Sequence, residues 1–170
     1  MVHRFWSGTV AGTYVGHGEC YVDAPAGAFL SRGGNLVGES PERLAFLRRV
    51  MEEGPACGMD PIDKWQDERV GGQHGEYYLY YFGRSAPESW QFQLYKDGVS
   101  EGQKYQAEVL DTWEMTVEPV GETFVTRRKD RYHFIDHEER SIALPGKPYM
   151  AIRIRRVSDA SSVAETESER

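Results

Sequence analysis

The chain has 170 residues, which is enough for one domain or for a small domain joined to part of another. Its formal net charge of −7 argues against nucleic acid or an anionic membrane surface as a partner, because both repel an acidic protein. Aromatic residues make up 12% of the sequence, a content that favours β-strands and sugar-facing surfaces.

The two cysteines, Cys20 and Cys57, are too few for a disulfide framework. One bridge between them stays open, and two free thiols in a reducing, cytoplasmic compartment are the preferred interpretation. The sequence holds no apolar run long enough for a membrane span, and its first residues do not resemble a signal peptide. Gly33-Gly34 does not belong to a phosphate-binding motif, and we expect no cofactor.

The first part of the chain predicts a helix and then a strand. Residues 3–12 place their apolar side chains on one helical face, and a glycine can end this helix. Thr13–Tyr21 (T-Y-V-G-H-G-E-C-Y) is typical of a strand that ends in the glycine-flanked residues His17 and Glu19. The residues 23–35 that follow are rich in Gly and Pro, which predicts a loop.

A second helix is predicted over Ser40–Glu53. Ser40 is a suitable N-cap, because its hydroxyl can accept a hydrogen bond from a free backbone N–H, and Pro41 suits the first helical position. Gly54-Pro55 would end the helix. The polar residues 56–75 are expected to be a connector and the boundary between two parts of the chain.

From residue 76 onward the apolar periodicity changes from helical to alternating. The tyrosines of the first strand and Trp113 are expected in the core, Asp97-Gly98 predicts a hairpin, and Arg153 and Arg155 should face solvent. The spacing of the segments is typical of a β-sandwich, and the acidic, Ser-rich residues 158–170 predict a disordered tail. The predicted strands are Glu76–Phe82, Trp90–Tyr95, Tyr105–Leu110, Glu114–Glu118, Thr123–Arg127, Tyr132–Ile135 and Pro148–Arg155.

The candidate binding residues lie at the end of the first predicted strand. Alternate side chains of a strand share a face, so His17 and Glu19 would point the same way. A carboxylate beside an imidazole could hydrogen-bond sugar hydroxyls or assist proton transfer, but a self-satisfied His–Glu pair explains the spacing equally well. Neither this cluster, with Cys20 or His74 added, nor His133 with His137 matches a zinc-ligand pattern, and we expect no metal.

Taken together, five stretches of the sequence resemble a family of bacterial TIM-barrel glycoside hydrolases. Members of this family look like apiosidase-type enzymes and carry a C-terminal domain of unknown function. The stretches are F-W-S-G-T-V-A-G-T-Y-V-G-H-G-E-C-Y at 5–21, G-E-S-P-E-R-L-A-F-L-R at 38–48, G-E-Y-Y-L-Y-Y-F-G at 75–83, Y-Q-A-E-V-L-D-T-W-E-M-T at 105–116 and L-P-G-K-P-Y-M-A-I-R-I at 144–154.

The resemblance implies an α+β fold, the last βα unit of a TIM barrel followed by a small antiparallel β-sandwich. Residues 1–55 would be the terminal barrel-like segment, 56–75 the connector, 76–157 the sandwich and 158–170 the tail. The sandwich should then fold without residues 1–71.

The resemblance also implies the site. His17, Glu19 and Tyr14 would bind substrate at the barrel mouth. The family's two catalytic carboxylates have no counterpart here, so no catalytic residue is predicted. The chain departs from the family where Ala28–Arg32 replaces a Trp-rich segment and where Cys20 occupies what looks like a Thr position.

These expectations describe a C-terminal fragment or accessory domain of a glycoside-hydrolase-like protein that acts on carbohydrate and does not cleave it alone. The alternative is a non-catalytic carbohydrate-binding or protein-interaction β-sandwich module, and a third possibility is a structural domain that covers a barrel. The expected partners are carbohydrate and either the missing barrel portion or a second copy of the chain. Nucleic acid and membranes are not expected as partners.

Overall fold

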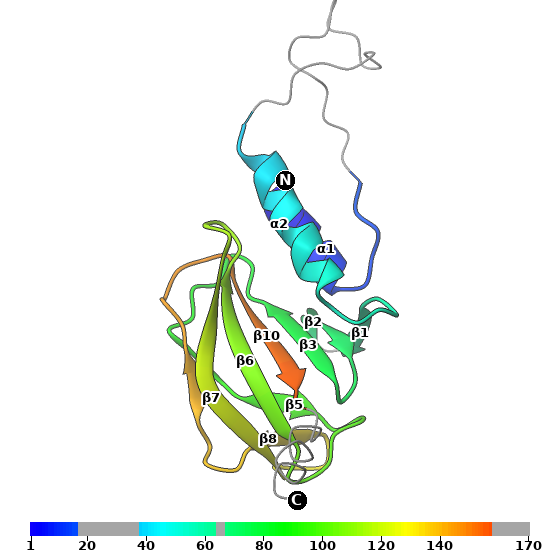
Figure 1. Cartoon of the computed structure of the whole chain (residues 1–170), viewed down its shortest axis with the longest axis vertical. Helices are drawn as coiled ribbons and strands as arrows, with labels where there is room; N and C mark the ends of the chain where they lie inside the picture. Colours follow the sequence, from blue (N-terminus) through cyan, green and yellow to red (C-terminus); the bar gives the residue numbers. More distant parts are fainter. Residues whose placement is uncertain (17–37, 64–66, 158–170) are drawn as a thin grey trace, which may run out of the picture.

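The computed structural model describes residues 1–16, 38–63 and 67–157 (Figure 1). Two helices, α1 (Val2–Val10) and α2 (Ser40–Glu52), precede the strands. The strands are β1 (Asp60–Asp63), β2 (Asp67–Gln73), β3 (Tyr77–Tyr81), β4 (Ser89–Gln91), β5 (Gln93–Tyr95), β6 (Lys104–Asp111), β7 (Thr116–Arg128), β8 (His133–Asp136), β9 (Ser141–Ala143) and β10 (Met150–Arg156).

Eight of these strands form one antiparallel sheet in the order β1-β2-β3-β10-β6-β7-β8-β5, which curls into a nearly closed barrel (Figure 1). The long strand β7 allows this curvature, because most of its length pairs with β6 while Thr126–Arg128 pair with β8. Strands β4 and β9 pair separately as a two-stranded ribbon. The two edges of the large sheet are therefore β1 and β5.

Strand β3 separates two apolar cores, and all five of its residues are buried. Tyr78 and Tyr80 face the interior of the curled sheet, while Tyr77, Leu79 and Tyr81 alternate to the outer face. The interior of the curled sheet is filled with close-packed aromatic and aliphatic side chains. The expectation that the tyrosines of this strand form core is confirmed.

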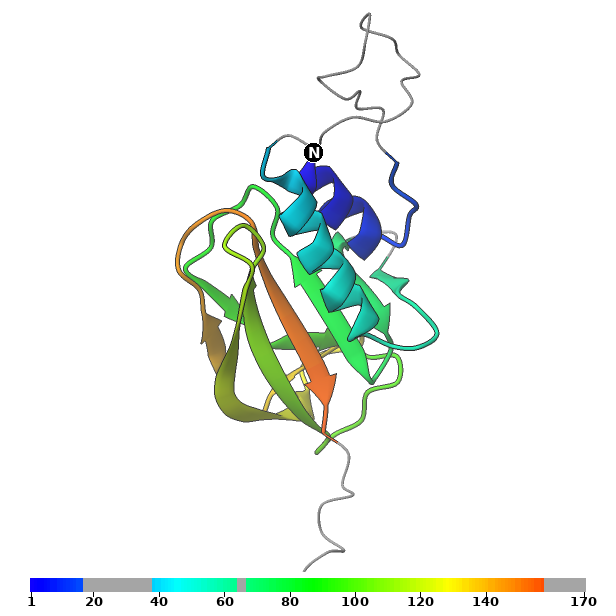
Figure 2. The ribbon, with the colours of Figure 1, turned by 45° about the horizontal axis from the view of Figure 1, so that its top comes forward.

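The helices cover the outer face of the sheet, side by side over β3 and β10 (Figure 2). Trp6 and Val10 of α1 and Val50 of α2 are completely buried there. Ion pairs also fix the C-terminal end of α2 to the sheet. Arg153 of β10 contacts Glu53, which follows α2, and Glu108 of β6, each at 2.6 Å. Arg153 is only 3% exposed, so the prediction that it faces solvent is wrong: the outward face of β10 lies under the helices.

The predicted fold class, an α+β chain with the last βα unit of a TIM barrel before a small β-sandwich, is wrong. The described residues contain no βα unit of a parallel sheet: the two helices pack on a mostly antiparallel, eight-stranded sheet. Residues 13–16, the described part of the predicted first strand, form neither helix nor strand. An amphipathic helix shows which of its faces is buried, but not whether the sheet beneath it is parallel or antiparallel.

Both predicted helices are confirmed to within one or two residues at each end. The N-cap of α2 is Glu39 and not Ser40, and no side chain caps the helix end. The expected connector 56–75 contains strands β1 and β2, whose two glycines and three aspartates interrupt the alternation of apolar residues that would predict a strand. The predicted tail 158–170 lies outside the described residues.

Three strand predictions need correction. Trp90–Tyr95 is divided between β4 and β5, because the chain passes from the ribbon to the large sheet at Phe92. The segments 114–118 and 123–127 belong to one strand, β7, which contains Gly121, and β9 was not predicted. Asp97-Gly98 forms a turn after β5, but β5 pairs with β8 and not with the following strand.

Candidate functional site

The residues predicted to bind substrate are only partly described. His17 and Glu19 lie outside the described residues. Tyr14 is fully exposed, and the described structure gives it no contact that would orient it. The chain that leads to His17 nevertheless reaches a cavity, because Val15 and Gly16 line its wall.

This cavity, named here the helix-end pocket, has a volume of about 840 Å³. It lies where the first turns of α1 and α2 meet three loops of the sheet, the β3–β4, β6–β7 and β9–β10 loops. The side chains that give it chemical character are His3, Arg4, Arg43, Arg84, Trp113 and Tyr149. These residues come from segments far apart in the sequence, and the packing of the helices on the sheet brings them together.

An aromatic pair forms one wall of the helix-end pocket. Trp113 is stacked on Tyr149, with ring centroids 5.5 Å apart and an interplanar angle of 28°. The guanidinium of Arg43 lies 4.0 Å from the Trp113 ring centroid, and its Nε donates a 3.0 Å hydrogen bond to the Trp113 carbonyl. Trp113 is still 41% exposed, so it is held in place and remains accessible. Its predicted place in the core is wrong.

Tyr149 adopts a backbone conformation that residues other than glycine rarely take, with φ at 66°. Three hydrogen bonds hold it: its amide donates to Gly83 (2.6 Å), and its carbonyl accepts from the amide (3.1 Å) and hydroxyl (2.7 Å) of Thr112. A tyrosine in this conformation costs free energy that surrounding contacts must offset. The strain is consistent with a ring that is kept at the pocket for binding.

His3 connects the pocket to the sheet. Its Nδ1 lies 3.2 Å from the Tyr81 hydroxyl, and its ring lies 5.9 Å from that of Tyr149. Burial, followed by the positive charge of Arg84, lowers the pKa of His3. Burial raises the pKa of Tyr81, so its hydroxyl keeps its proton and can donate to Nδ1. When the Tyr81 hydroxyl donates to Nδ1, the N–H of neutral His3 lies on Nε2 and can donate to a ligand; in the other tautomer Nδ1 donates to Tyr81 and Nε2 can accept.

The helix-end pocket carries positive charge in a protein whose net charge is negative. Arg43 is paired with Glu39, its Nη1 lying 3.2 Å from Oε2. The side chains of Arg4 and Arg84 have no hydrogen bond or ion pair with the described residues. Glu39 is the one carboxylate among the described residues of the lining, and its charge is already engaged. The pocket can therefore bind oxygen-rich ligands, but its described lining offers no pair of carboxylates.

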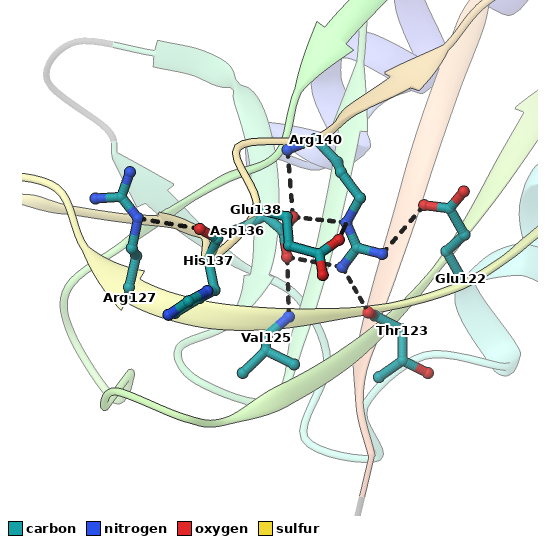
Figure 3. A network of polar contacts seen from close by, with 8 residues as sticks. All are labelled: Glu122, Thr123, Val125, Arg127, Asp136, His137, Glu138 and Arg140. Atoms are coloured by element: carbon teal, nitrogen blue, oxygen red, sulfur yellow. Dashed lines mark hydrogen bonds and ion pairs between the residues drawn. The ribbon is translucent and has the colours of Figure 1, made fainter.

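A second polar cluster, around Asp136, has a different character (Figure 3). The Asp136 carboxylate is completely buried and accepts hydrogen bonds from the amide of Val125 and from the backbone and guanidinium of Arg140. Arg140 in turn donates to the Thr123 carbonyl and contacts Glu122. Since the buried carboxylate and the guanidinium are engaged by protein partners, we interpret this cluster as a fastening of the turn after β8 and not as a ligand site.

The parts of the chain that the structure describes hold no group of three or more His, Cys, Asp or Glu side chains that could bind a metal. The described helices are also too short and too polar to cross a membrane. Cys57 is exposed, and Cys20 lies outside the described residues.

Sequence reasoning missed the helix-end pocket because no motif marks it. His3, Arg84 and Tyr149 are isolated residues in three different segments, and nothing in their sequence neighbourhoods distinguishes them. The alternation of the adjacent strand favoured a buried Trp113, but this residue follows the strand end and lies in the β6–β7 turn. Such a site depends on tertiary packing and becomes visible only in three dimensions.

Comparison with known proteins adds two findings. A family model with the description Domain of unknown function (DUF5605) matches residues 65–155. A crystal structure titled as a "putative glycoside hydrolase" from Bacteroides vulgatus ATCC 8482 is similar to the chain, with 29% sequence identity and a TM-score of 0.79 over 92% of this chain. The chain spans 32% of the length of that protein. No curated protein matches the chain significantly.

Proposed function

The chain belongs to the family of the Domain of unknown function (DUF5605), and from that premise we propose that it is an accessory, carbohydrate-binding region of a glycoside-hydrolase-like protein. The similarity to the Bacteroides vulgatus protein supports the carbohydrate-related role. We also propose that the larger glycoside-hydrolase-like protein is an apiosidase-type enzyme, as the resemblance of the sequence implies. The expected binding partners are a saccharide and the larger remainder of such a protein.

The observation that carries this proposal is the stacked pair of exposed Trp113 and half-buried Tyr149, which lies in the helix-end pocket with Arg4 and Arg84, whose guanidinium groups pair with no described residue. A sugar ring presents apolar C–H groups on its faces and hydroxyl oxygens around its rim. Aromatic side chains pack against the apolar faces, while Arg4, Arg84 and the N–H of His3 can donate to the oxygens. Pockets of this size with a few converging polar groups are the usual form of small-ligand sites.

Binding without cleavage follows from the lining of the pocket. Glycoside hydrolysis commonly needs two carboxyl groups that flank the bond, at separations of about 5 to 9.5 Å. The described lining provides Glu39 alone, which is paired with Arg43. We propose that the catalytic carboxylates belong to a part of the larger protein outside the region that this chain matches.

We keep Tyr14, His17 and Glu19 as proposed substrate-binding residues. Their support is that the chain reaches the pocket wall at Val15 and Gly16, directly between Tyr14 and His17. Saccharide binding by this segment would place an imidazole and a carboxylate near the aromatic pair. Replacing Glu19 by Gln tests this contribution, because the change removes charge and preserves size.

Isothermal titration calorimetry with a panel of neutral and acidic oligosaccharides tests the proposal. Arg84→Ala and Trp113→Ala should each weaken binding about tenfold or more, because each removes a contact at the centre of the site. Arg48→Ala is the matched control, since Arg48 lies on the exposed face of α2 and contacts only Glu52 among the described residues. Binding that is unchanged by Arg84→Ala and Trp113→Ala would contradict this placement of the site.

A further inference from the structure

A second cavity, of about 710 Å³, lies where the two edges of the curled sheet approach each other. It is named here the edge-strand pocket. One side consists of Asp60–Asp63 of β1, and the other consists of Tyr95 at the end of β5 with the turn that follows. The β2–β3 turn contributes His74, the β7–β8 turn contributes Tyr132, and the first residue of β8 contributes His133. The edge-strand pocket therefore occupies the opening between the two edge strands, β1 and β5, of the nearly closed sheet.

Three rings line the edge-strand pocket in fixed positions. The rings of Tyr95 and His133 lie 5.3 Å apart, and Tyr132 meets His133 edge-on at 6.5 Å. The His133 ring is oriented by Asp130, whose carboxylate oxygens lie 3.1 Å from Nδ1. Tyr132 is 54% exposed, among the most exposed large aromatic side chains of the described structure. An exposed ring on a fixed support is a surface on which a ligand can pack.

Three polar groups of the edge-strand pocket have no partner among the described residues. The carboxylates of Asp60 and Asp97 have no hydrogen bond or ion pair with the described residues. The Nδ1 atom of His74 is buried and also without a hydrogen-bond partner there. Buried polar atoms in proteins are nearly always satisfied, so an orphaned atom beside a cavity indicates a partner that the described residues do not supply.

We propose that the edge-strand pocket binds a neutral saccharide, as a second site separate from the helix-end pocket. A sugar ring would pack on Tyr132, and its hydroxyl groups would donate to the carboxylates of Asp60 and Asp97. The Lys96 ammonium, which lies 5.8 Å from the Tyr132 ring centroid, would donate to a ring or hydroxyl oxygen. Only the choice of carbohydrate as the ligand class rests on the proposed function; the site itself does not.

The charge of the pocket selects among saccharides. Among the described residues, its lining holds three aspartates, Asp60, Asp63 and Asp97, and one lysine, Lys96. A carboxylated sugar would be repelled, whereas neutral hydroxyl groups can donate hydrogen bonds to the carboxylates of Asp60 and Asp97. An amino sugar is also disfavoured, because its ammonium group would be repelled by Lys96 and Arg131, which both lie over the Tyr132 ring. The two pockets therefore differ in the sign of their charge, since the helix-end pocket carries Arg4 and Arg84, which pair with no described residue.

The test is a titration of the isotope-labelled chain, followed by NMR, with neutral hexasaccharides of β-linked glucose, xylose and mannose. A uronate hexasaccharide and a glucosamine hexasaccharide are the comparison ligands. At least one neutral ligand should shift the resonances of Tyr95, His133 and His74 saturably, while the charged ligands should shift them about tenfold more weakly or not at all. Equal or stronger shifts with either charged ligand, or no shift with any neutral ligand, would overturn the proposal.

Variants separate this site from the helix-end pocket. Tyr132→Ala and Asp97→Asn should each weaken the neutral ligand about tenfold at these resonances, while Tyr132→Phe preserves most of the affinity. Trp113→Ala should leave these shifts unchanged, because it lies in the other pocket. Unchanged binding in Tyr132→Ala and Asp97→Asn, with melting temperatures like that of the parent chain, would overturn the second site. One further outcome separates the two proposals. If the neutral ligand still shifts the resonances of the edge-strand pocket, while Trp113→Ala and Arg84→Ala do not weaken saccharide binding in the calorimetric test, the second site is upheld and the helix-end pocket is refuted.

Discussion

Asp136 offers the sharpest stability prediction, because its carboxylate is completely buried and held by one arginine. Burial alone would raise its pKa, but hydrogen bonds from Arg140 and from two backbone amides outweigh it and lower the pKa from 3.8 to about 2. The difference corresponds to about 2 kcal/mol, at about 1.36 kcal/mol per pKa unit. We therefore expect Asp136→Asn to lower the free energy of unfolding by about 2 to 3 kcal/mol at neutral pH.

The pH dependence of this effect has a definite sign. A carboxylate whose pKa is lower in the folded state contributes stability above its ordinary pKa, and this contribution is lost as the pH falls through the folded value. Urea unfolding should show a constant cost of Asp136→Asn from pH 7 to about 5, which shrinks toward pH 2. Glu138→Gln is the matched control, because Glu138 contacts the same Arg140 but is 69% exposed, and it should cost less than about 1 kcal/mol. Equal costs for both variants, or a cost of Asp136→Asn that does not change with pH, would refute this reasoning.

Three further predictions concern the layer between helices and sheet. Leu47→Ala should destabilise the chain by about 2 to 5 kcal/mol in urea unfolding, because it leaves a cavity on the outer face of the sheet. Arg153→Ala should cost about 3 to 5 kcal/mol, since it leaves Glu53 and Glu108 without their buried partner, whereas Arg155→Ala should cost less than about 1 kcal/mol; equal costs would contradict the burial argument. Removing residues 1–55 should abolish cooperative thermal unfolding, because it uncovers the outer face of β3; a sharp melting transition in the shortened chain would instead support the division predicted from the sequence.

The sequence predicted local elements better than their arrangement. The periodicity of the apolar residues and the Pro at the start of α2 were enough to place both helices. The same kind of pattern could not show that Arg153 is buried, because alternation separates the two faces of a strand without saying that helices cover the outer one. It could not show the curvature of the sheet either, which depends on β7 exchanging one partner for another along its length.

The candidate sites were less predictable than the fold. The tyrosines Tyr77, Tyr78, Tyr80 and Tyr81 are core residues, as the sequence predicted, so they offer no sugar-facing surface. The exposed rings, Trp113 and Tyr132, lie in turns, where neither periodicity nor a motif distinguishes a binding residue from any other. Their neighbours in space come from distant segments, so their chemistry emerges only when the sheet curls and the helices pack on it.

The central claim is that the helix-end pocket binds carbohydrate, and the indole N–H resonances of the tryptophans test it most directly. Trp113 lies at the pocket and is 41% exposed, whereas Trp6 is completely buried beneath the helices and serves as an internal control. In a titration of the labelled chain with neutral and acidic oligosaccharides, the account predicts a saturable shift of the Trp113 resonance with at least one ligand and none of Trp6. An unmoved Trp113 resonance with every ligand, or equal shifts of both tryptophans, would contradict it.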